Sequence, residues 1–330
     1  MSDSEKTAFM ANPLFPATRA GNNMAHHWFD AVNTGIRSMG QLLDLSNNMF
    51  RSMARQQNDA MEVYLNTITG KPESTGQTAA RKELKTGTAV VTGGTGGLGT
   101  EICKRLAGDG NRIVSTYIAA EEEQAQQWKK QMETEGFEVD LFECDVTDFD
   151  QCREVAQAIE NKYGPVDVLV NCAGITRDGL LKKMDEADWH AVLDTNLDSV
   201  FNVTRNFIDG MLKNGYGRIV NISSVNGQKG QFGQTNYSSA KAGMIGFSRS
   251  LALELADTGI TVNCVCPGYV ATAMVEAIRE DILEGIVAQI PMGRLAKPVE
   301  IADAVAFLAG RNSGYITGTE LAVNGGLWLG

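Results

Sequence analysis

Three residues in the second half of the chain have types and spacing suited to proton transfer at an oxygen atom. Tyr237 and Lys241 are four positions apart, so on a helix they share a face. A free tyrosine has a pKa near 10 and is a poor acid or base at neutral pH. A positive charge nearby, such as a lysine ammonium, would stabilise the phenolate and lower that pKa. Ser224, upstream of the pair, can hold a substrate oxygen through its hydroxyl.

Asn196 is a fourth candidate, since its amide can hold a water that returns protons through Lys241. The alternative is that Tyr237 is only a helix surface residue, because Tyr-x-x-x-Lys arises often by chance. The combination with Ser224 and with a glycine-rich turn favours the chemical role. We therefore predict that Asn196, Ser224, Tyr237 and Lys241 are catalytic.

The glycine-rich turn runs from Thr92 to Gly99 and follows a short apolar segment. Gly93, Gly97 and Gly99 permit a tight turn and let the backbone approach a pyrophosphate, which the next helix attracts with its N–H groups and positive end. The spacing is Gly-x-x-x-Gly-x-Gly, and glycine-rich hairpins are common. Here the turn opens a strand–helix–strand pattern, which is the context that a dinucleotide site needs.

The elements that position these residues alternate between strands and helices after residue 85. Such alternation predicts an α/β fold with a parallel, doubly wound sheet covered on both faces. Ser224 then follows the fifth strand, at the carboxyl edge where such sheets bind ligands. The predicted strands are 88–91, 112–116, 139–144, 166–170, 218–222, 261–265 and 320–323. The first predicted helix follows the glycine-rich turn and ends near residue 106, and the second begins at residue 121. A third covers 148–163, helical segments after the fourth strand extend to residue 212, and a further helix covers 237–255.

Composition excludes several classes of protein. The 330 residues carry a formal net charge of −11, which argues against a general nucleic-acid binder. The first residues are polar and no run of about 18 apolar residues occurs, so we expect no signal peptide, no membrane span and a cytoplasmic location. No metal-binding spacing appears, and we expect buried thiols rather than disulfides at the six cysteines, Cys103, Cys144, Cys152, Cys172, Cys264 and Cys266.

Residues 86–330 resemble the short-chain dehydrogenase/reductase family, which implies a Rossmann-type sheet and hydride transfer with a nicotinamide. The chain departs from the usual Asn-Asn-Ala-Gly of that family at Cys172, a position that mainly supports the sheet interior. The motifs that carry the resemblance are Thr92–Gly99, Asp145-Val146, Asn171-Cys-Ala-Gly174, Asn196, Ser224, Tyr237-x-x-x-Lys241 and Pro267-Gly268.

The resemblance also implies a set of residues that bind the cofactor. These are Thr92, Gly93, Gly97, Leu98, Gly99, Tyr117, Asp145, Val146, Asn171, Ala173, Gly174, Tyr237, Lys241, Pro267, Gly268, Val270 and Thr272.

Within this family, residues 219–237 are very similar to the acetoacetyl-CoA reductases of polyhydroxybutyrate synthesis, as are residues 173–178 and 324–330. The likeness implies reduction of acetoacetyl-CoA to (R)-3-hydroxybutyryl-CoA by a homotetramer. It implies that Asp178, Gln231, Gln234 and Tyr269 seat the acetoacetyl group, although the two glutamines also fit a polar surface loop. Two alternatives are a reductase of 3-oxoacyl chains on acyl carrier protein and a non-catalytic, granule-associated structural protein.

The end of the second strand bears on the choice between NADH and NADPH. An acidic residue there accepts the ribose hydroxyls of NAD, whereas an arginine suits the phosphate of NADP. No arginine follows the strand, and Glu121–Glu123 stand where related reductases have basic residues. The same glutamates also fit a solvated first helical turn. We expect NADH to be tolerated or preferred.

Residues 1–85 precede the region of resemblance and are predicted to form a separate extension. Apolar side chains recur at helical spacing between residues 23 and 67, and residues 70–85 read as a polar linker. Such a helix can pack on the catalytic oligomer, pair with its own copies or contact a polyhydroxyalkanoate granule surface. The apolar positions are Trp28, Val32, Ile36, Met39, Leu43, Phe50 and Met53.

Overall fold

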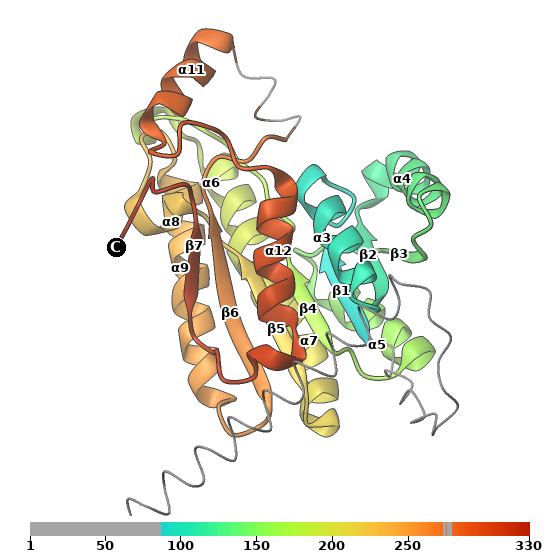
Figure 1. Ribbon diagram of the computed structural model, residues 1–330. Coiled ribbons are helices and arrows are strands. Elements are labelled where there is room, and N and C mark those ends of the chain that lie inside the picture. Colours follow the sequence, from blue (N-terminus) through green and yellow to red (C-terminus); the bar gives the residue numbers. More distant parts are fainter. Residues whose placement is uncertain (1–86, 273–274, 276–278) are drawn as a thin grey trace, which may run out of the picture. The chain divides into compact units, whose positions relative to one another are not determined.

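The computed structural model describes residues 87–272, 275 and 279–330 (Figure 1). The predicted helical extension and linker of residues 1–85 lie outside the described residues. In the described part, helices and strands alternate along the chain from Thr88 to Val323.

A seven-stranded sheet with the order β3-β2-β1-β4-β5-β6-β7 forms the centre of this part, and all its strand pairs are parallel. The chain moves outward from β1 in one direction to β3 and then returns to place β4 on the other side of β1. The point of reversal therefore lies between β1 and β4, where such sheets bind ligands. The strands are β1 (Thr88–Thr92), β2 (Arg112–Tyr117), β3 (Val139–Glu143), β4 (Val168–Asn171), β5 (Gly217–Ile222), β6 (Ile260–Pro267) and β7 (Glu320–Val323).

Helices cover both faces of the sheet. The α-helices of the described part are α3 (Gly97–Gly108), α4 (Glu122–Thr134), α5 (Phe149–Tyr163), α6 (Glu186–Leu193), α7 (Ser199–Asn214), α8 (Val225–Lys229), α9 (Thr235–Glu254), α11 (Glu280–Gln289) and α12 (Pro298–Ala309). Short 3₁₀ turns occur at η1 (Ala119–Glu121), η2 (Leu181–Lys183) and η4 (Arg311–Ser313), and a π-helical turn at η3 (Asp194–Asp198).

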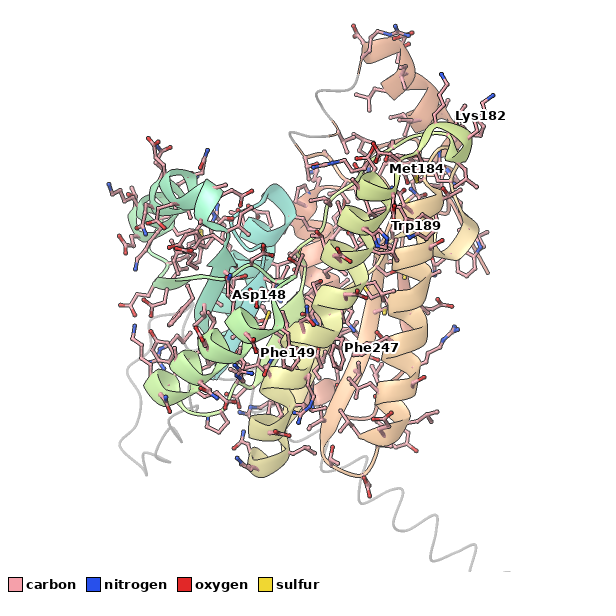
Figure 2. All side chains as sticks on the ribbon, turned by 180° about the vertical axis from the view of Figure 1, so that it is seen from behind. Asp148, Phe149, Lys182, Met184, Trp189 and Phe247 are labelled. Carbon is pink, nitrogen blue, oxygen red and sulfur yellow. The ribbon has the colours of Figure 1, made fainter. Side chains whose placement is uncertain are left out.

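The two faces have separate hydrophobic cores. Helices α3, α4 and α12 pack on one face, and α5, α7 and α9 pack on the other (Figures 1 and 2). Strand β1 illustrates the alternation, because Ala89 and Val91 belong to the first core and Val90 to the second. Since both faces are covered, all five residues of β1 are buried, which explains the unbroken apolar run in the sequence.

The structure confirms the predicted α/β class and all seven predicted strands, with ends that differ by at most two residues. The stretch predicted as helical up to residue 212 is divided into α6, η3 and α7. Helices α8, α11 and α12 were not predicted. Helix α12 begins with Pro298 at its first turn and a capping box that includes Glu300, which are recognisable start signals.

No helix of the described residues is long and apolar enough to cross a membrane. All six cysteines are free thiols, as expected, and five of them are buried. Cys172, which follows the last residue of β4, is half-buried.

Candidate active site

The turn between β1 and α3 requires glycine at several positions. Gly93 has φ +63°, and a Cβ atom there would lie 2.9 Å from the Cα atom of Ala173. A Cβ atom at Gly99 would lie only 2.2 Å from the carbonyl oxygen of Gly93. Side chains at these positions would therefore collide with backbone atoms, so the turn and the first residues of α3 exist in this form only with glycine.

The ends of β1 and β4 are held together beside this turn. The Thr92 hydroxyl oxygen accepts hydrogen bonds from the backbone N–H groups of Cys172 at 3.0 Å and Ala173 at 3.2 Å. Thr272 approaches from the segment after β6, where its side chain would lie 3.6 Å from a Cβ atom at Gly97. The predicted cofactor residues of three distant segments thus meet at the reversal point of the sheet.

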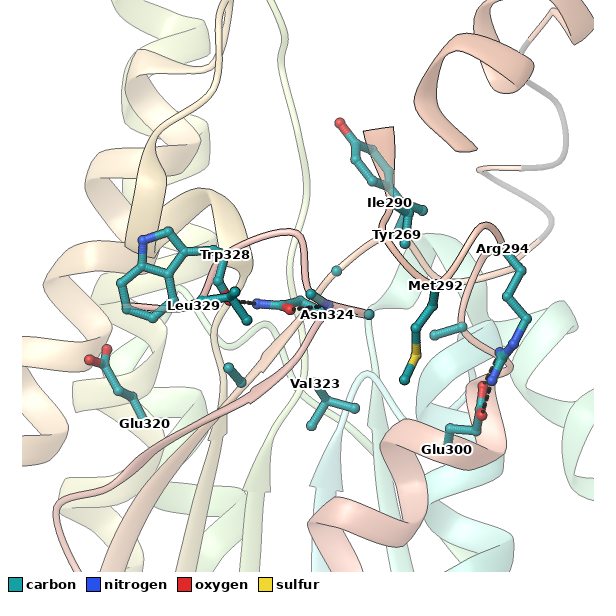
Figure 3. Close-up of a pocket in the computed structure, with 15 residues that line it drawn as sticks. Tyr269, Ile290, Met292, Arg294, Glu300, Glu320, Val323, Asn324, Trp328 and Leu329 are labelled. Atoms are coloured by element: carbon teal, nitrogen blue, oxygen red, sulfur yellow. Dashed lines mark hydrogen bonds and ion pairs between the residues drawn. The ribbon is translucent and has the colours of Figure 1, made fainter. Parts of the chain in front are cut away.

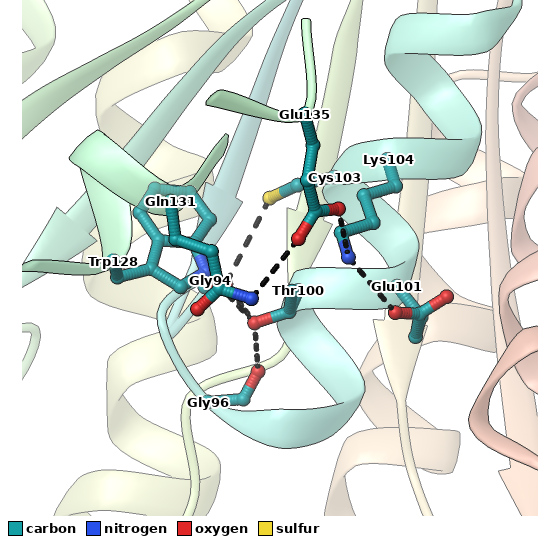
Figure 4. A network of polar contacts seen from close by, with 9 residues as sticks. All are labelled: Gly94, Gly96, Thr100, Glu101, Cys103, Lys104, Trp128, Gln131 and Glu135. Atoms are coloured by element: carbon teal, nitrogen blue, oxygen red, sulfur yellow. Dashed lines mark hydrogen bonds and ion pairs between the residues drawn. The ribbon is translucent and has the colours of Figure 1, made fainter. Parts of the chain in front are cut away.

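A network of polar contacts links the glycine-rich turn and α3 to α4 (Figure 4). The Trp128 indole N–H on α4 donates to the Thr100 hydroxyl at 2.8 Å, and that hydroxyl lies 2.7 Å from the carbonyl oxygen of Gly96. The ammonium of Lys104 on α3 also pairs with Glu135, just beyond α4, at 2.6 Å. Trp128 and Thr100, which the sequence analysis did not single out, therefore brace the glycine-rich turn from the outside.

A second set of predicted cofactor residues follows β3. The Asp145 carboxylate accepts hydrogen bonds from the Thr147 backbone N–H at 2.9 Å and hydroxyl at 2.8 Å, which forms a tight local turn. Asn202, on α7, donates its side-chain N–H to the carbonyl oxygens of Val146 at 3.1 Å and Thr147 at 3.2 Å. Asn202 was missed by the sequence analysis, because a buried asparagine inside a helical pattern carries no motif of its own.

Ser224, Tyr237 and Lys241 are brought together at the carboxyl end of β5. Ser224 is the N-cap of α8, and its hydroxyl oxygen accepts the backbone N–H of Asn226 at 3.1 Å. Tyr237 and Lys241 lie on α9, with the Lys241 ammonium 5.6 Å from the centre of the Tyr237 ring. That ammonium donates to the carbonyl oxygen of Ile222, the last residue of β5, at 2.8 Å.

Burial is the largest influence on the pKa values of Tyr237 and Lys241. It raises the pKa of Tyr237 to about 12, although a hydrogen bond with Ser224 lowers the value somewhat. It also lowers the pKa of Lys241 to about 8. The sequence predicts a lowered tyrosine pKa, whereas in the protein alone the pKa is raised, because loss of water destabilises the phenolate more than its neighbours stabilise it. Tyr237 is thus a protonated donor at neutral pH.

Asn196 lies in the π-helical turn η3 and is fully buried. Its side-chain N–H group donates to the carbonyl oxygens of Ile175 at 2.8 Å and Val192 at 2.9 Å. Its oxygen has no hydrogen-bond partner among the described residues. A Cβ atom at Gly174 would lie 2.6 Å from that oxygen and 3.5 Å from the Lys241 ammonium, so Asn196 and Lys241 flank the same glycine. A bridging water fits the unpaired oxygen.

The predicted substrate residues are brought together in part. The Gln234 side-chain N–H donates to the Asp178 carboxylate at 2.9 Å, and a backbone bond from Gly179 to Gly233 joins the same two loops. Burial raises the pKa of Tyr269, and the negative charge of Asp178 adds to that rise, which places Asp178 near Tyr269. Gln231 is instead held by the Lys229 ammonium, whose nitrogen lies 3.0 Å from its amide oxygen.

A cavity of about 650 Å³ lies beside β7 and the C-terminal segment (Figure 3). Gly268 and Tyr269 line it together with Met292, Val323 and Trp328. None of Asn196, Ser224, Tyr237 and Lys241 is a lining residue, so this cavity is not the space above the proton-transfer group.

The end of β2 carries acidic rather than basic side chains. Tyr117 is the last residue of β2, and a hydrogen bond with Glu122 raises the pKa of its hydroxyl to about 12. Helix α4 begins at Glu122, and Glu121, Glu122 and Glu123 are all exposed. Glu122 and Glu123 also accept hydrogen bonds from Gln126 and Gln127 one turn later.

Comparison with known proteins agrees with this arrangement. The family model of the short chain dehydrogenases matches residues 87–283. The chain belongs to the short-chain dehydrogenase family. It is therefore an oxidoreductase that uses a nicotinamide cofactor.

Curated relatives within this family align with nearly their whole length. An acetoacetyl-CoA reductase of Allochromatium vinosum is 56% identical over 241 residues, which cover 73% of this chain and 98% of the relative. An acetoacetyl-CoA reductase of Cupriavidus necator is 54% identical over 242 residues, with the same two shares. A 3-oxoacyl-[acyl-carrier-protein] reductase of Haemophilus influenzae is 45% identical over 241 residues, again 73% of this dehydrogenase and 98% of the relative.

Proposed function

We propose that this dehydrogenase reduces acetoacetyl-CoA to (R)-3-hydroxybutyryl-CoA. The observation that carries the proposal is the convergence of Ser224, Tyr237 and Lys241 at the carboxyl edge of the sheet, next to the paired side chains of Asp178 and Gln234. Relatives that are named acetoacetyl-CoA reductases are 54–56% identical, which supports the choice of substrate.

The residues of the chain divide the reaction between them. The nicotinamide supplies the hydride that adds to the ketone carbon. Ser224 donates a hydrogen bond to the carbonyl oxygen, and Tyr237 transfers its phenolic proton to that oxygen as the carbon–oxygen double bond becomes a single bond. Proton transfer by a positioned side chain contributes about 10²–10⁴ in rate. Lys241 stabilises the phenolate that remains, and a water held by Asn196 brings the next proton.

The residues present fit a dinucleotide at the glycine-rich turn. Gly93, Gly97 and Gly99 leave the backbone uncovered there, and the N-terminus of α3 presents its N–H groups. Thr272 approaches the same turn, and the Asp145–Val146 segment follows a neighbouring strand. These residues would hold the pyrophosphate and the adenine half, while Lys241 would hold the ribose beside the reacting carbon.

We further propose that NADH is the preferred cofactor. Tyr117 ends β2, where the adenosine ribose of a bound dinucleotide would lie, and the Glu122 carboxylate at the start of α4 is near enough to raise the pKa of the Tyr117 hydroxyl. Carboxylates accept hydrogen bonds from ribose hydroxyls and repel a 2′-phosphate. No lysine or arginine occurs between Tyr117 and Glu123 to offset that repulsion.

Assembly and location are also proposals. We propose a homotetramer, and an exposed aromatic pair supports contact between copies, since Phe149 on α5 and Phe201 on α7 stack at 5.9 Å while remaining 37% and 50% exposed (Figure 2 labels Phe149). We propose a cytoplasmic enzyme whose catalytic domain covers residues 86–330. The preceding extension would pack on the oligomer or contact a polyhydroxyalkanoate granule through residues 23–67.

Reduction of a 3-oxoacyl chain on acyl carrier protein is the alternative. The 45% identical relative from Haemophilus influenzae has that name, and Lys182 and Lys183 in η2 offer exposed positive charge to an acidic carrier.

Steady-state kinetics with acetoacetyl-CoA and with acetoacetyl carrier protein, each with NADH and with NADPH, separates these proposals. The highest kcat/KM is expected for acetoacetyl-CoA with NADH. A higher value for the carrier-protein thioester would select the alternative, and a strong preference for NADPH would refute the cofactor proposal.

A further inference from the structure

A chain of hydrogen bonds connects the turn that contains Ser224 to the loop that contains Asp178. The side-chain N–H group of Asn226 donates to the amide oxygen of Gln234 at 2.8 Å. The amide nitrogen of Gln234 donates in turn to the Asp178 carboxylate at 2.9 Å. Asn226 is 8% exposed, so little water competes for its side chain.

The negative charge of Asp178 determines which group donates and which accepts in each of these two hydrogen bonds. A carboxylate only accepts hydrogen bonds, so Gln234 must turn its nitrogen toward Asp178. Its oxygen then faces Asn226, which must present a donor. Among side chains of similar size, asparagine supplies an N–H donor, whereas leucine and valine have no polar group and an ionised aspartate only accepts hydrogen bonds.

The backbone around Asn226 is held in place by close contacts. Its own backbone N–H donates to the Ser224 hydroxyl at 3.1 Å. The next residue, Gly227, packs so closely on α9 that a Cβ atom there would lie 2.8 Å from the carbonyl carbon of Lys241. Helix α8 is thus pressed against the helix that carries Tyr237 and Lys241, and the Asn226 side chain projects from a fixed backbone.

The other end of the Asn226 amide supports the same conclusion. Its oxygen is buried and has no hydrogen-bond partner among the described residues. Leaving a buried acceptor without a hydrogen bond is unfavourable. The side chain holds this orientation despite that cost, which indicates that the bond to Gln234 sets it.

We propose that Asn226 is a positioning residue that fixes the orientation of the Gln234 amide. Through that amide it also fixes the position of the Asp178 carboxylate relative to Ser224 and Tyr237. The inference rests on the proposed function, in which Asp178 and Gln234 seat the acetoacetyl group. In this role Asn226 acts through Gln234 and needs no contact of its own with the substrate or the cofactor. Its role is to tie the acyl-binding loop to the proton-transfer group, so that the ketone carbon meets both.

Replacing the donor with an acceptor of the same shape tests the proposal. In Asn226→Asp, the introduced carboxylate faces the Gln234 oxygen, and the Gln234 amide cannot turn its nitrogen toward both carboxylates, because they lie at its two ends. At pH 8 we expect kcat/KM for acetoacetyl-CoA to fall about 10- to 100-fold, with the larger part in KM, whereas Asn226→Leu loses about 5- to 10-fold because one hydrogen bond is missing. Protonation makes the introduced carboxyl a donor, so activity of Asn226→Asp should recover toward acid pH, and that of Asn226→Leu should not.

Two controls separate this role from general damage. Asn214→Asp makes the same charge change at an exposed position beyond the opposite end of β5, and it should leave both kinetics and pH profile unchanged. In a Gln234→Ala background, Asn226→Asp should cost much less than in the wild type, because its partner is already gone.

Equal losses in the two backgrounds, or a loss in Asn226→Asp that does not change with pH, would overturn the proposal. Crystal structures of the wild type and Asn226→Asp at pH 8 give a readout without turnover. The Gln234 nitrogen should contact Asp178 in the former and turn away in the latter, and an unchanged contact in the variant would also overturn it. Absence of wild-type turnover with acetoacetyl-CoA would instead defeat the proposed function.

Discussion

Lys241 should make the folded protein less stable than it would be with an apolar side chain. The side chain is 3% exposed, its ammonium donates to the carbonyl oxygen of Ile222, and no carboxylate of the described residues pairs with it. Burial lowers its pKa from the ordinary 10.5 to about 8. At 1.36 kcal/mol per pH unit, that difference corresponds to about 3 kcal/mol against the charged form in the folded state.

The sign of this effect is specific. Below pH 8 both the folded and the unfolded protein bind the proton, so the full cost is present. Between pH 8 and 10.5 the unfolded chain still binds a proton that the folded protein releases, so wild-type stability rises with pH across this window. Lys241→Met keeps the length of the side chain and removes the charge. We expect it to raise the free energy of unfolding by about 1–3 kcal/mol at pH 7, because part of the gain is offset by the lost hydrogen bond to Ile222.

Urea unfolding of the cofactor-free protein at pH 7 and pH 9.5, at one protein concentration, measures the difference. The advantage of Lys241→Met should shrink at the higher pH, while its reductase activity is lost at both. Lys130→Met, at an exposed position on α4, is the matched control and should show no such pH dependence. The reasoning would be refuted if Lys241→Met were less stable than the wild type at pH 7. It would also be refuted if the difference in free energy of unfolding between variant and wild type were the same at both pH values.

Three further predictions concern the reaction, the cofactor and the extension. Tyr237→Phe should retain fold and cofactor binding but lose about 10²–10⁴ in kcat, since the acid is removed; near-wild-type turnover would contradict its role. Glu122→Arg should raise the ratio of kcat/KM for NADPH to that for NADH, with Glu154→Arg on the exposed side of α5 as the matched charge change; an unchanged ratio would mean that Glu122 does not face the ribose. Deletion of residues 1–80 should leave turnover intact and change assembly size or granule association, as measured by light scattering and co-sedimentation; loss of turnover in a folded truncation would show that the extension reaches the active site.

The sequence predicts the sheet well because buried parallel strands need unbroken apolar segments, such as Val90 and Val91 between Thr88 and Thr92. The glycine-rich turn is equally predictable, since its backbone geometry at Gly93 and Gly99 excludes side chains. Tyr237 and Lys241 could be paired because helix periodicity places them on one face.

Other features depend on contacts that spacing does not reveal. Burial determines the pKa of Tyr237, and no local pattern measures how much water the fold removes from its hydroxyl. Asn202 and Asn226 act through hydrogen bonds to residues on other elements, so nothing beside them in the sequence marks their roles. The π-helical turn around Asn196 lies within a stretch that the sequence predicts only as helical up to residue 212, and nothing local in the sequence marks the turn.

The most direct test of the central claim follows the hydride itself. The enzyme is incubated with acetoacetyl-CoA and NADH that carries deuterium on the transferable position of the nicotinamide, and the product is examined by mass spectrometry and chiral chromatography. We predict (R)-3-hydroxybutyryl-CoA with a single deuterium at carbon 3 in the wild type and almost no labelled product from Tyr237→Phe. Product without deuterium at that carbon, or with the (S) configuration, would contradict the account.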